Sequence, residues 1–424
     1  MGKNSYSNQE ELPRALRKNS RSKTSNYRIN NEVPKALRNC KKTYNDDIPM
    51  ALRNRRTSYY EDEEEISNRR IQRKPSTNRS NQVKTKKGKK KKRHIFRKLL
   101  IILILIVAIL AGGLYWLIQD KLSKINYVEI DKGELAVSNN VTPGYRNIAI
   151  LAIDSRDINN NQGSRSDGII IASIDENSKN INLVSVYRDT YLQVEGHGLT
   201  KVTHAYAYGG PELAIKTLNQ NLDLNISEFV SVNFESVASA IDAMGGVEIE
   251  IKDYEVEEMN LYIAETAEIT GREENMIPGP GVYNLDGVQA TTYGRIRQVG
   301  NGDYERTERM RTVIMKAFEK AKHLDPFTLN NLVDQILPKV QTNIDSQSIV
   351  GLMLQIGSYN MSENIGWPYE TKGKTLDAWY GIPVTLEENV KQLHNELFNN
   401  TDYEVPQTVK DISKKIINKT GYSK

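Results

Sequence analysis

The sequence has a single cysteine, Cys40, among its 424 residues. One thiol cannot form a disulfide within the chain, so no disulfide framework is expected. The five histidines are scattered and form no His-Glu-x-x-His pair, which excludes the common zinc-protease site. A Walker phosphate-binding loop and a Gly-x-Ser-x-Gly nucleophile elbow are also missing. The chain therefore belongs to none of the enzyme classes that these short motifs define.

Charge is distributed unevenly along the chain. The net charge is +5, but the first hundred residues are strongly basic and the remainder is slightly acidic. The basic cluster Lys84–Lys98 directly precedes Leu99–Ile118, an uncharged run rich in Leu and Ile. About 20 apolar residues in a helix match a hydrocarbon core of about 30 Å. The run lacks the periodic polar positions of a buried core helix, so we predict a transmembrane helix over residues 99–118.

The charges around this apolar run predict its orientation. Lys and Arg before the run keep the N-terminus cytoplasmic and place the rest of the chain outside the cell. A cleaved signal peptide would have a shorter apolar region and a small-residue cleavage site, which does not follow Ile118. Tyr115 and Trp116 near the outer end are typical of a membrane interface. We expect a single-pass protein of the cell membrane with an uncleaved signal-anchor and an extracellular domain.

Residues 1–98 have few apolar side chains and many Asn, Ser, Lys and Arg, so we predict a disordered cytoplasmic tail. Three short Pro-x-Ala-Leu-Arg repeats begin at Pro13, Pro34 and Pro49. They are either linear motifs for a cytoplasmic partner or chance similarity within a low-complexity tail. The cluster Lys84–Lys98 lies beside the anchor, which favours anionic lipid head groups over nucleic acid as its partner.

The remainder divides into a polar stalk (119–145), a folded domain (146–400) and a polar C-terminal tail (401–424). The domain contains apolar runs of strand length that are mostly continuous rather than alternating, which favours a sheet covered on both faces. Helical patterns lie between and after these runs. We therefore predict an α/β domain, with a mixed central sheet and helices on both faces. The expected strands are 148–153, 169–174, 181–187, 229–232 and 247–251, and the expected helices are 211–222, 235–244, 286–295, 304–323 and much of 326–357.

Charged residues cluster where the first three strands begin or end. Asp154 and Arg156 follow the first strand, Asp167 begins the second, and Arg188 and Asp189 follow the third. Ligands of α/β sheets bind beyond the carboxyl ends of strands. Any one of these residues is an ordinary loop residue by itself, but their accumulation predicts a site.

A second group of charges lies near the helix that begins at Asp303. Arg306 precedes Met310 by four residues and Arg309 precedes Val313 by four, so both arginines share the apolar face of this helix. Buried guanidinium groups need anionic partners, either a structural carboxylate or a bound phosphate. The other arginines of the two charged groups are Arg156, Arg188, Arg295 and Arg297. Such an excess favours a pyrophosphate, with Asp154 and Asp167 holding Mg²⁺.

Several motifs, in their order and spacing, resemble the LytR-CpsA-Psr family of cell-wall glycopolymer transferases. The resemblance covers roughly residues 146–343, and the anchor and basic tail are similar to the family's topology. The motifs are Asn147-Ile-Ala-Ile-Leu-Ala-Ile-Asp-Ser-Arg156, Arg165-Ser-Asp-Gly168, Val186-Tyr-Arg-Asp-Thr-Tyr191, Lys201-Val-Thr-His-Ala-Tyr206, Gly209-Gly210, Gly245-Gly-Val247 and Gly302-Asp-Tyr-Glu-Arg-Thr-Glu-Arg309.

The resemblance implies a phosphotransferase of the Gram-positive cell wall. Such enzymes move an anionic glycopolymer, of the teichoic acid or capsule type, from a polyprenyl-pyrophosphate carrier to peptidoglycan, with the muramic acid 6-hydroxyl as the expected acceptor. It also implies Mg²⁺ (or Mn²⁺) at Asp154 and Asp167. The implied catalytic residues are Arg156, Arg188 and Asp303. Either Asp303 or Asp189 would orient or deprotonate the acceptor hydroxyl, and the alternative is that both are only partners of the arginines. The implied pyrophosphate ligands are Arg156, Arg188, Arg295, Arg297, Arg306 and Arg309.

Two departures from the family's pattern stand out. Met310 occupies a position that is usually Gln, and Tyr187 one that is usually Pro. Neither removes a charged site residue, so we expect activity to survive. The carrier lipid needs an apolar channel, which helices 211–222 and 235–244 and the segment 261–269 could line; a packed core at these positions is the alternative.

Two other functions fit the same residues. One is a hydrolase that cleaves polyprenyl pyrophosphates and releases free glycopolymer. The other is a non-enzymatic cell-wall binding or signalling protein whose output is the repeats of the tail.

Overall fold

The computed structural model describes residues 100–109, 123–158 and 163–423. The predicted cytoplasmic tail lies outside the described residues. Residues 100–109 of the predicted anchor form a helix, and the rest of that segment also lies outside them. Within the described ranges, no helix has the length and apolar character that crossing a membrane requires.

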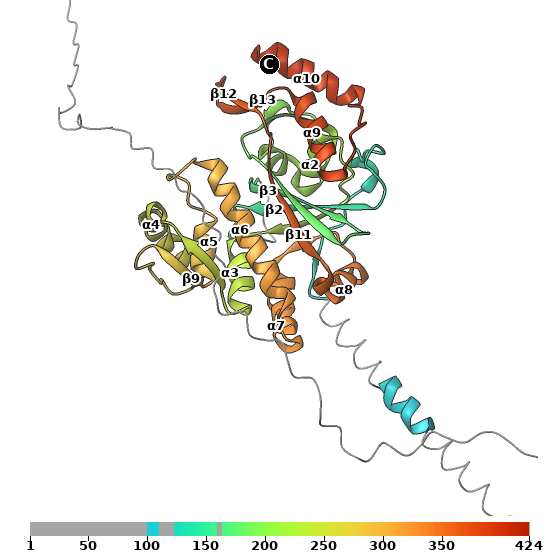
Figure 1. Cartoon of the computed structure of the whole chain (residues 1–424), viewed down its shortest axis with the longest axis vertical. Helices are drawn as coiled ribbons and strands as arrows, with labels where there is room; N and C mark the ends of the chain where they lie inside the picture. The colour runs from blue at the N-terminus through green and yellow to red at the C-terminus, as the bar shows by residue number, and fades with distance from the viewer. Residues whose placement is uncertain (1–99, 110–122, 159–162, 424) are drawn as a thin grey trace, which may run out of the picture. The chain divides into compact units, whose positions relative to one another are not determined.

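A seven-stranded mixed sheet forms the centre of the folded domain (Figure 1). Strand pairs β2–β3, β3–β4 and β7–β10 are antiparallel, whereas β2–β7, β4–β11 and β1–β10 are parallel. The strand order is β1 (Asn126–Tyr127), β10 (Gln341–Thr342), β7 (Glu228–Val232), β2 (Tyr145–Ile153), β3 (Ser166–Asp175), β4 (Asn180–Val186) and β11 (Asn360–Trp367).

Helices cover both faces of this sheet because its strands are apolar on both sides. Leu151 and Ile169 face a core that is completed by α2 (His204–Leu222), α9 (Leu386–Phe398) and α10 (Gln407–Thr420). Ile148 and Ile170 face the opposite core, which packs against α6 and α8. The helices on that side are α3 (Phe234–Ala243), α5 (Gly287–Tyr293), α6 (Asp303–Lys322), α7 (Pro326–Ile336) and α8 (Ser346–Leu354). The predicted mixed α/β architecture is confirmed.

A smaller lobe has its own core beside α3, α5 and α6. It contains α4 (Asp253–Thr270) and a hairpin of β8 (Val247–Ile251) and β9 (Gly281–Leu285). We expected 247–251 in the central sheet, and this prediction is wrong. Buried and exposed residues alternate along β8, which is the pattern of a strand covered on one face only.

Two further hairpins and three short 3₁₀ helices complete the part of the fold that the structure describes. The hairpins are β5 (Tyr191–Val194) with β6 (Gly198–Lys201), and β12 (Thr371–Thr375) with β13 (Trp379–Pro383). The 3₁₀ helices are η3 (Lys132–Glu134), η4 (Leu337–Lys339) and η5 (Ile356–Ser358).

The predicted boundaries of the domain need correction at both ends. Residues 126–145 are not a stalk, because β1 extends the central sheet and Leu135 is fully buried in the main core. Residues 401–423 are not a loose tail, because Val409, Ile412 and Ile416 of α10 bury one apolar stripe in the same core. Three apolar residues at helical spacing are easily overlooked in a segment that is otherwise polar.

Candidate functional site

The predicted charges meet at one edge of the central sheet. β2, β4 and β7 end there, and β3 begins there. The guanidinium of Arg188, after β4, lies 2.7 Å from the carboxylate of Asp167 at the start of β3. The backbone N–H of Asp154, after β2, donates to the carbonyl of Arg165 (3.1 Å). The antiparallel arrangement of β2, β3 and β4 therefore brings three separate motifs together.

Helix α6 contributes the other half of this cluster. Its N-cap is Gly302 with φ of 61°, a conformation that glycine adopts without strain. Arg306 is buried and donates to the backbone carbonyl of Asp167 (3.0 Å). Asp303 lies 2.8 Å from Arg297 and 3.4 Å from Arg306. Hence α6 and the loop before it join the strand-end charges at Asp167.

Positive charge exceeds negative charge in this cluster. Four cations share three carboxylates: Arg188, Arg297, Arg306 and Lys201 against Asp167, Asp189 and Asp303. Burial lowers the pKa of Arg306, the two carboxylates raise it, and the guanidinium groups of Arg188 and Arg297 lower it further. The Nε atoms of Arg188 and Arg306 are buried without a hydrogen-bond acceptor. A group of cations that ranges from buried Arg306 to partly exposed Arg297 and has unused donors is the chemical complement of a multiply charged anion.

Asp189 and Lys201 extend the cluster toward the β5–β6 hairpin. Lys201 lies 2.6 Å from Asp189, and Asp189 is 3.8 Å from Arg188. A small pocket joins Arg188 and Asp189 to Asp303 and Tyr304. The two carboxylates considered for the acceptor hydroxyl, Asp189 and Asp303, therefore line one pocket.

Two predicted residues lie at the exposed border of the cluster. Asp154 and Arg156 belong to the loop after β2, and both are exposed to solvent. The carbonyl of Ser155 between them accepts a hydrogen bond from Asn233 (3.1 Å), which fixes this loop to the start of α3. Arg156 directly follows Ser155, which this hydrogen bond holds in place, and the side chain of Arg156 remains exposed to solvent.

Arg309 does not join the arginine cluster. It is buried as predicted, but its Nε lies 2.7 Å from the equally buried carboxylate of Glu255. A second guanidinium nitrogen donates to the carbonyl of Ile296 (3.2 Å), and Glu305 lies 3.4 Å from the third. The partner of Arg309 is therefore a structural carboxylate rather than a bound phosphate. The sequence could not reveal this because Glu255 lies 54 positions away on α4.

An apolar cavity of about 260 Å³ lies between the sheet and its covering helices. Gly168 and Arg295 are part of its wall, next to the cluster. The guanidinium of Arg295 lies 4.4 Å from the ring centre of Phe234, and it reaches Thr266 (2.6 Å) and Glu265 (3.1 Å). The other wall residues include Ile150, Ile170, Val237, Ala240, Met310, Ile314, Ile336 and Val340.

The cavity corresponds only in part to the predicted channel. Helix α3, which covers 235–243 of the predicted helix 235–244, lines it as expected. Helix α2 packs in the core on the opposite face of the sheet, and no residue of 261–269 is part of the wall. The remaining walls come from α5, α6 and the α7–η4 segment.

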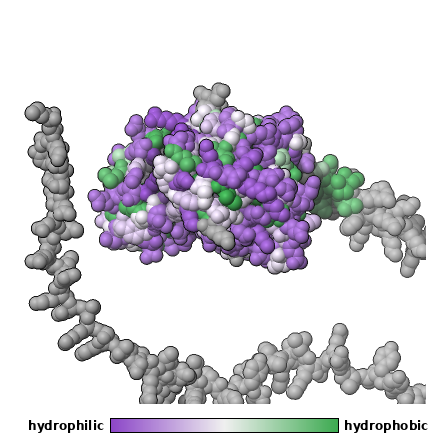
Figure 2. Space-filling model, turned by 90° about the horizontal axis from the view of Figure 1, so that it is seen from above, coloured by the Kyte–Doolittle hydropathy of each residue, from purple (hydrophilic) through white to green (hydrophobic). Residues whose placement is uncertain are grey.

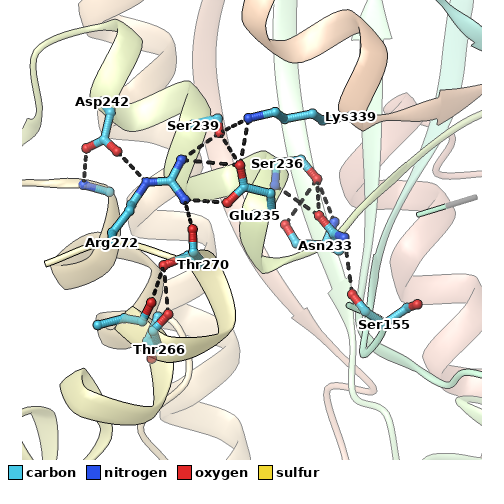
Figure 3. Close-up of polar contacts among 12 residues, drawn as sticks. Ser155, Asn233, Glu235, Ser236, Ser239, Asp242, Thr266, Thr270, Arg272 and Lys339 are labelled. Atoms are coloured by element: carbon cyan, nitrogen blue, oxygen red, sulfur yellow. Dashed lines mark hydrogen bonds and ion pairs between the residues drawn. The ribbon is translucent and has the colours of Figure 1, made fainter. Parts of the chain in front are cut away.

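A polar network connects the segments that carry the cavity wall (Figure 3). Asn233 and Ser236 form a capping box at the start of α3. Arg272, after α4, pairs with Glu235 and Asp242 of α3, and Lys339 of η4 lies 2.6 Å from Glu235. These contacts tie α4 and η4 to α3. Sequence reasoning missed them because only the Asn-x-x-Ser cap leaves a local pattern.

Comparison with known proteins identifies the family. A profile of the LytR_cpsA_psr family matches residues 115–398. The chain belongs to this family. The resemblance found in the sequence motifs is thereby confirmed.

The family's characterised members include similar proteins. A Bacillus subtilis protein named polyisoprenyl-teichoic acid–peptidoglycan teichoic acid transferase TagT is 28% identical over 296 residues, which are 67% of this chain and 88% of that protein. A protein named as the corresponding transferase TagU of Enterococcus faecalis is 33% identical over 234 residues, 54% of this chain and 70% of that one.

Solved structures share the fold of the family domain. A Streptococcus agalactiae protein superposes with a TM-score of 0.53 at 22% identity, covering 62% of this chain and 90% of that one. Bacillus subtilis TagT superposes with a TM-score of 0.50 at 23% identity, covering 65% and 100%.

The two residues that depart from the family's pattern, Met310 and Tyr187, both pack next to the arginine cluster. Met310 lies in the cavity wall, where its sulfur packs beside Gly168. Tyr187 packs edge-on against Tyr304, with ring centres 4.5 Å apart, and its hydroxyl lies over Gly366. Both residues extend apolar packing next to the arginines and leave the ion pairs of the cluster in place.

The acidic residues of the site are compatible with a shared cation. Within the described ranges, no group of three or more His, Cys, Asp or Glu could hold a metal by itself. Asp154 and Asp167 lie on neighbouring strand ends, since Ile153 pairs with Ser166. Mg²⁺ commonly takes one or two carboxylates and completes its shell with water and substrate phosphates. Asp154 and Asp167 are the residues that could hold such a cation, and the carboxylate of Asp167 also pairs with Arg188.

Proposed function

We propose that this chain transfers an anionic glycopolymer, of the teichoic acid or capsule type, from a polyprenyl-pyrophosphate carrier to peptidoglycan. The observation that carries the proposal is the contact between a cationic cluster and an apolar cavity. Arg306 and Met310 lie one turn apart on α6, one in the cluster and the other in the cavity wall. A pyrophosphate joined to an isoprenoid chain needs these two environments side by side.

We assign roles to the clustered residues from their positions. Arg188, Arg297 and Arg306 bind the pyrophosphate, and Arg295 lies where pyrophosphate and lipid meet. Arg156 approaches from the exposed loop. Asp154 and Asp167 would hold Mg²⁺ or Mn²⁺, which would neutralise phosphate charge. Positioning and charge neutralisation account for most of the catalysis of phosphoryl transfer.

The reaction replaces one P–O bond by another. The acceptor hydroxyl attacks the phosphorus that carries the glycopolymer and gives its proton to the carboxylate that orients it, while the bond to the bridging oxygen breaks and polyprenyl phosphate leaves. Asp303 holds Arg297 and Arg306 in place, and we assign to it the orientation of the acceptor hydroxyl. Asp189 is the alternative for that role, because it lines the same small pocket.

The cell membrane is the expected location. We propose that residues 99–118 anchor the chain, with the N-terminal tail in the cytoplasm and the α/β domain outside. The uncharged run and its flanking cluster Lys84–Lys98 support this topology. An anchored enzyme meets a lipid-linked substrate in the same bilayer, which raises their effective concentration. The Pro-x-Ala-Leu-Arg repeats would then meet a cytoplasmic partner.

A transfer assay with the full-length protein in phosphatidylglycerol–phosphatidylcholine vesicles tests the proposal. Labelled polyprenyl-pyrophosphate glycopolymer and peptidoglycan are supplied with and without Mg²⁺. We expect label to become bound to peptidoglycan, and the Arg188→Ala variant to abolish this. Free labelled glycopolymer in place of the bound form would identify a hydrolase. No turnover of the carrier would leave a binding protein, and full activity of Arg188→Ala would remove Arg188 from the catalytic site.

A further inference from the structure

Helices α7 and α8 expose an apolar surface to solvent. Leu354 is 82% exposed at the end of α8, and Phe327 is 73% exposed in the first turn of α7. Helix α8 has no charged residue and no buried residue, although most of its side chains are apolar. The carboxylate of Asp325 accepts hydrogen bonds from the N–H groups of Phe327 and Thr328, so Phe327 is part of an ordered helix cap. The exposure of Phe327 therefore belongs to the native fold.

Val350 and Met353 of α8 are half-buried. The region of the two helices that carries the exposed apolar residues Phe327 and Leu354 is named here the α7–α8 surface. Ile349 and Leu352, on the opposite side of α8, pack against the core of the sheet. Leu354 therefore lies on the side of α8 that faces away from the core.

The path of the chain places this surface close to the proposed anchor. β1 begins at Asn126, eight residues after Ile118. An extended chain of that length spans at most about 28 Å. β1 pairs with β10, which lies between η4 and α8 in the sequence. The tether thus reaches the domain at the corner where α7 leads through η4 to β10 and α8.

The arrangement of the domain agrees with an orientation in which the end that carries α7 and α8 faces the membrane. Figure 1 shows α7 and α8 at one end of the domain and α10 at the other. The view in Figure 2, from the α10 end, shows a mostly hydrophilic surface. Ile336 at the end of α7 and Val340 after η4 line the apolar cavity. The cavity therefore has a wall made by the helix that carries Phe327.

We propose that the α7–α8 surface rests in the outer leaflet of the membrane and presents the cavity to lipid. The occupant of the surface is the phospholipid bilayer, because the short tether holds this corner close to it. The proposal depends on the anchor and the lipid substrate proposed above. It adds that the domain is oriented on the membrane by Phe327 and Leu354, rather than suspended freely from its tether.

Fluorescence quenching of the full-length protein in vesicles tests this orientation. A polarity-sensitive dye is attached to Phe327→Cys or Leu354→Cys in a Cys40→Ser background, with Leu261→Cys as the control. Leu261 is a matched helix-surface residue, 68% exposed and outside the cavity wall. Phosphatidylglycerol–phosphatidylcholine vesicles contain brominated acyl chains. We expect the dyes at positions 327 and 354 to be quenched by the lipid, and the dye at 261 to be quenched by aqueous iodide.

A functional comparison separates docking from anchoring. The double variant Phe327→Ser/Leu354→Ser should lower the transfer rate in vesicles about tenfold, which corresponds to the loss of modest apolar contacts. The rate with a short-chain carrier in detergent should stay unchanged, and Leu261→Ser should be neutral in both assays. Iodide access to positions 327 and 354 equal to that at 261 would overturn the proposal, as would homo-quenching that rises with protein concentration and indicates a second copy on this surface. Loss of the protein from vesicles on alkaline washing would instead overturn the anchor.

Discussion

Two buried arginines on one helix turn have opposite surroundings. Arg309 faces Glu255, and each side chain is almost fully buried against the other. Arg306, three residues earlier, shares Asp303 and Asp167 with two other guanidinium groups and keeps its Nε without an acceptor. Arg309 has two carboxylates for its one charge, Glu255 and Glu305, although one of its nitrogens also lacks a hydrogen-bond acceptor. The cluster around Arg306 instead has more cations than carboxylates. Burial of an arginine therefore does not identify a binding site; the balance of its partners does.

The largest loss of stability should follow from breaking the ion pair between Arg309 and Glu255. Arg309→Met leaves the Glu255 carboxylate buried without its cation, which costs about 3–5 kcal/mol of unfolding free energy. Denaturant unfolding of the folded domain measures this loss. Removing both charges in Arg309→Met/Glu255→Gln should recover most of it, because Gln can still accept the hydrogen bond from the Lys252 N–H. A single variant as stable as the parent chain would show that the pair is not structural.

Substitution in the arginine cluster around Arg306 should lower the transfer activity rather than the stability. Arg306→Ala should lower the transfer rate by about 10²–10³, the usual effect of losing one preorganised group that stabilises transition-state charge. Its unfolding free energy should fall far less than that of Arg309→Met, since it relieves repulsion from Arg188 and Arg297. Lys316→Ala, an exposed cation on the same helix, is the matched control. Equal losses of stability in Arg306→Ala and Arg309→Met would remove the distinction between the two arginines.

The comparison of Arg306 with Arg309 also shows which features of the site can be predicted from the sequence. Helical spacing predicts correctly that Arg306 and Arg309 are buried, and strand ends predict correctly that Asp167 and Arg188 lie close together. Both inferences depend on local periodicity or on the geometry of a sheet. The partner of Arg309 depends on how α4 packs against α6, which no local pattern records.

The domain boundaries and the cavity wall were harder to predict for a related reason. Helix α10 carries its apolar residues at helical spacing, but only the fold shows that these residues are buried in the main core. Likewise, α2 and α3 are both apolar helices, and only the topology decides which covers the cavity face. The network around Glu235 joins three segments that are far apart in the sequence.

The apolar cavity extends the comparison from charge to shape. Ala240→Phe would fill space beside Val237 and Ile336 and should exclude long isoprenoid chains. We expect the KM for a long-chain carrier to rise about tenfold, equivalent to about 1.4 kcal/mol, while a short-chain carrier reacts as before. Ala264→Phe, on the exposed side of α4, is the control. Equal KM changes for both carriers would indicate general distortion rather than an obstructed lipid site.

The smallest effect concerns the polar network around Glu235 and depends on pH. Burial raises the pKa of Glu235, but hydrogen bonds from Arg272 and Lys339 outweigh it, and the pKa lies below its ordinary value. A lowered carboxylate pKa stabilises the fold above the unfolded-state value of about 4.3. That contribution is lost as pH falls through the folded-state pKa. Glu235→Gln should therefore lower the unfolding free energy at pH 7 by less than about 1 kcal/mol, as for other partly exposed pairs, and the two stability curves should converge in acid. Parallel curves between pH 3 and 7 would show that this network, unlike the Arg309 pair, contributes no stability through its charge.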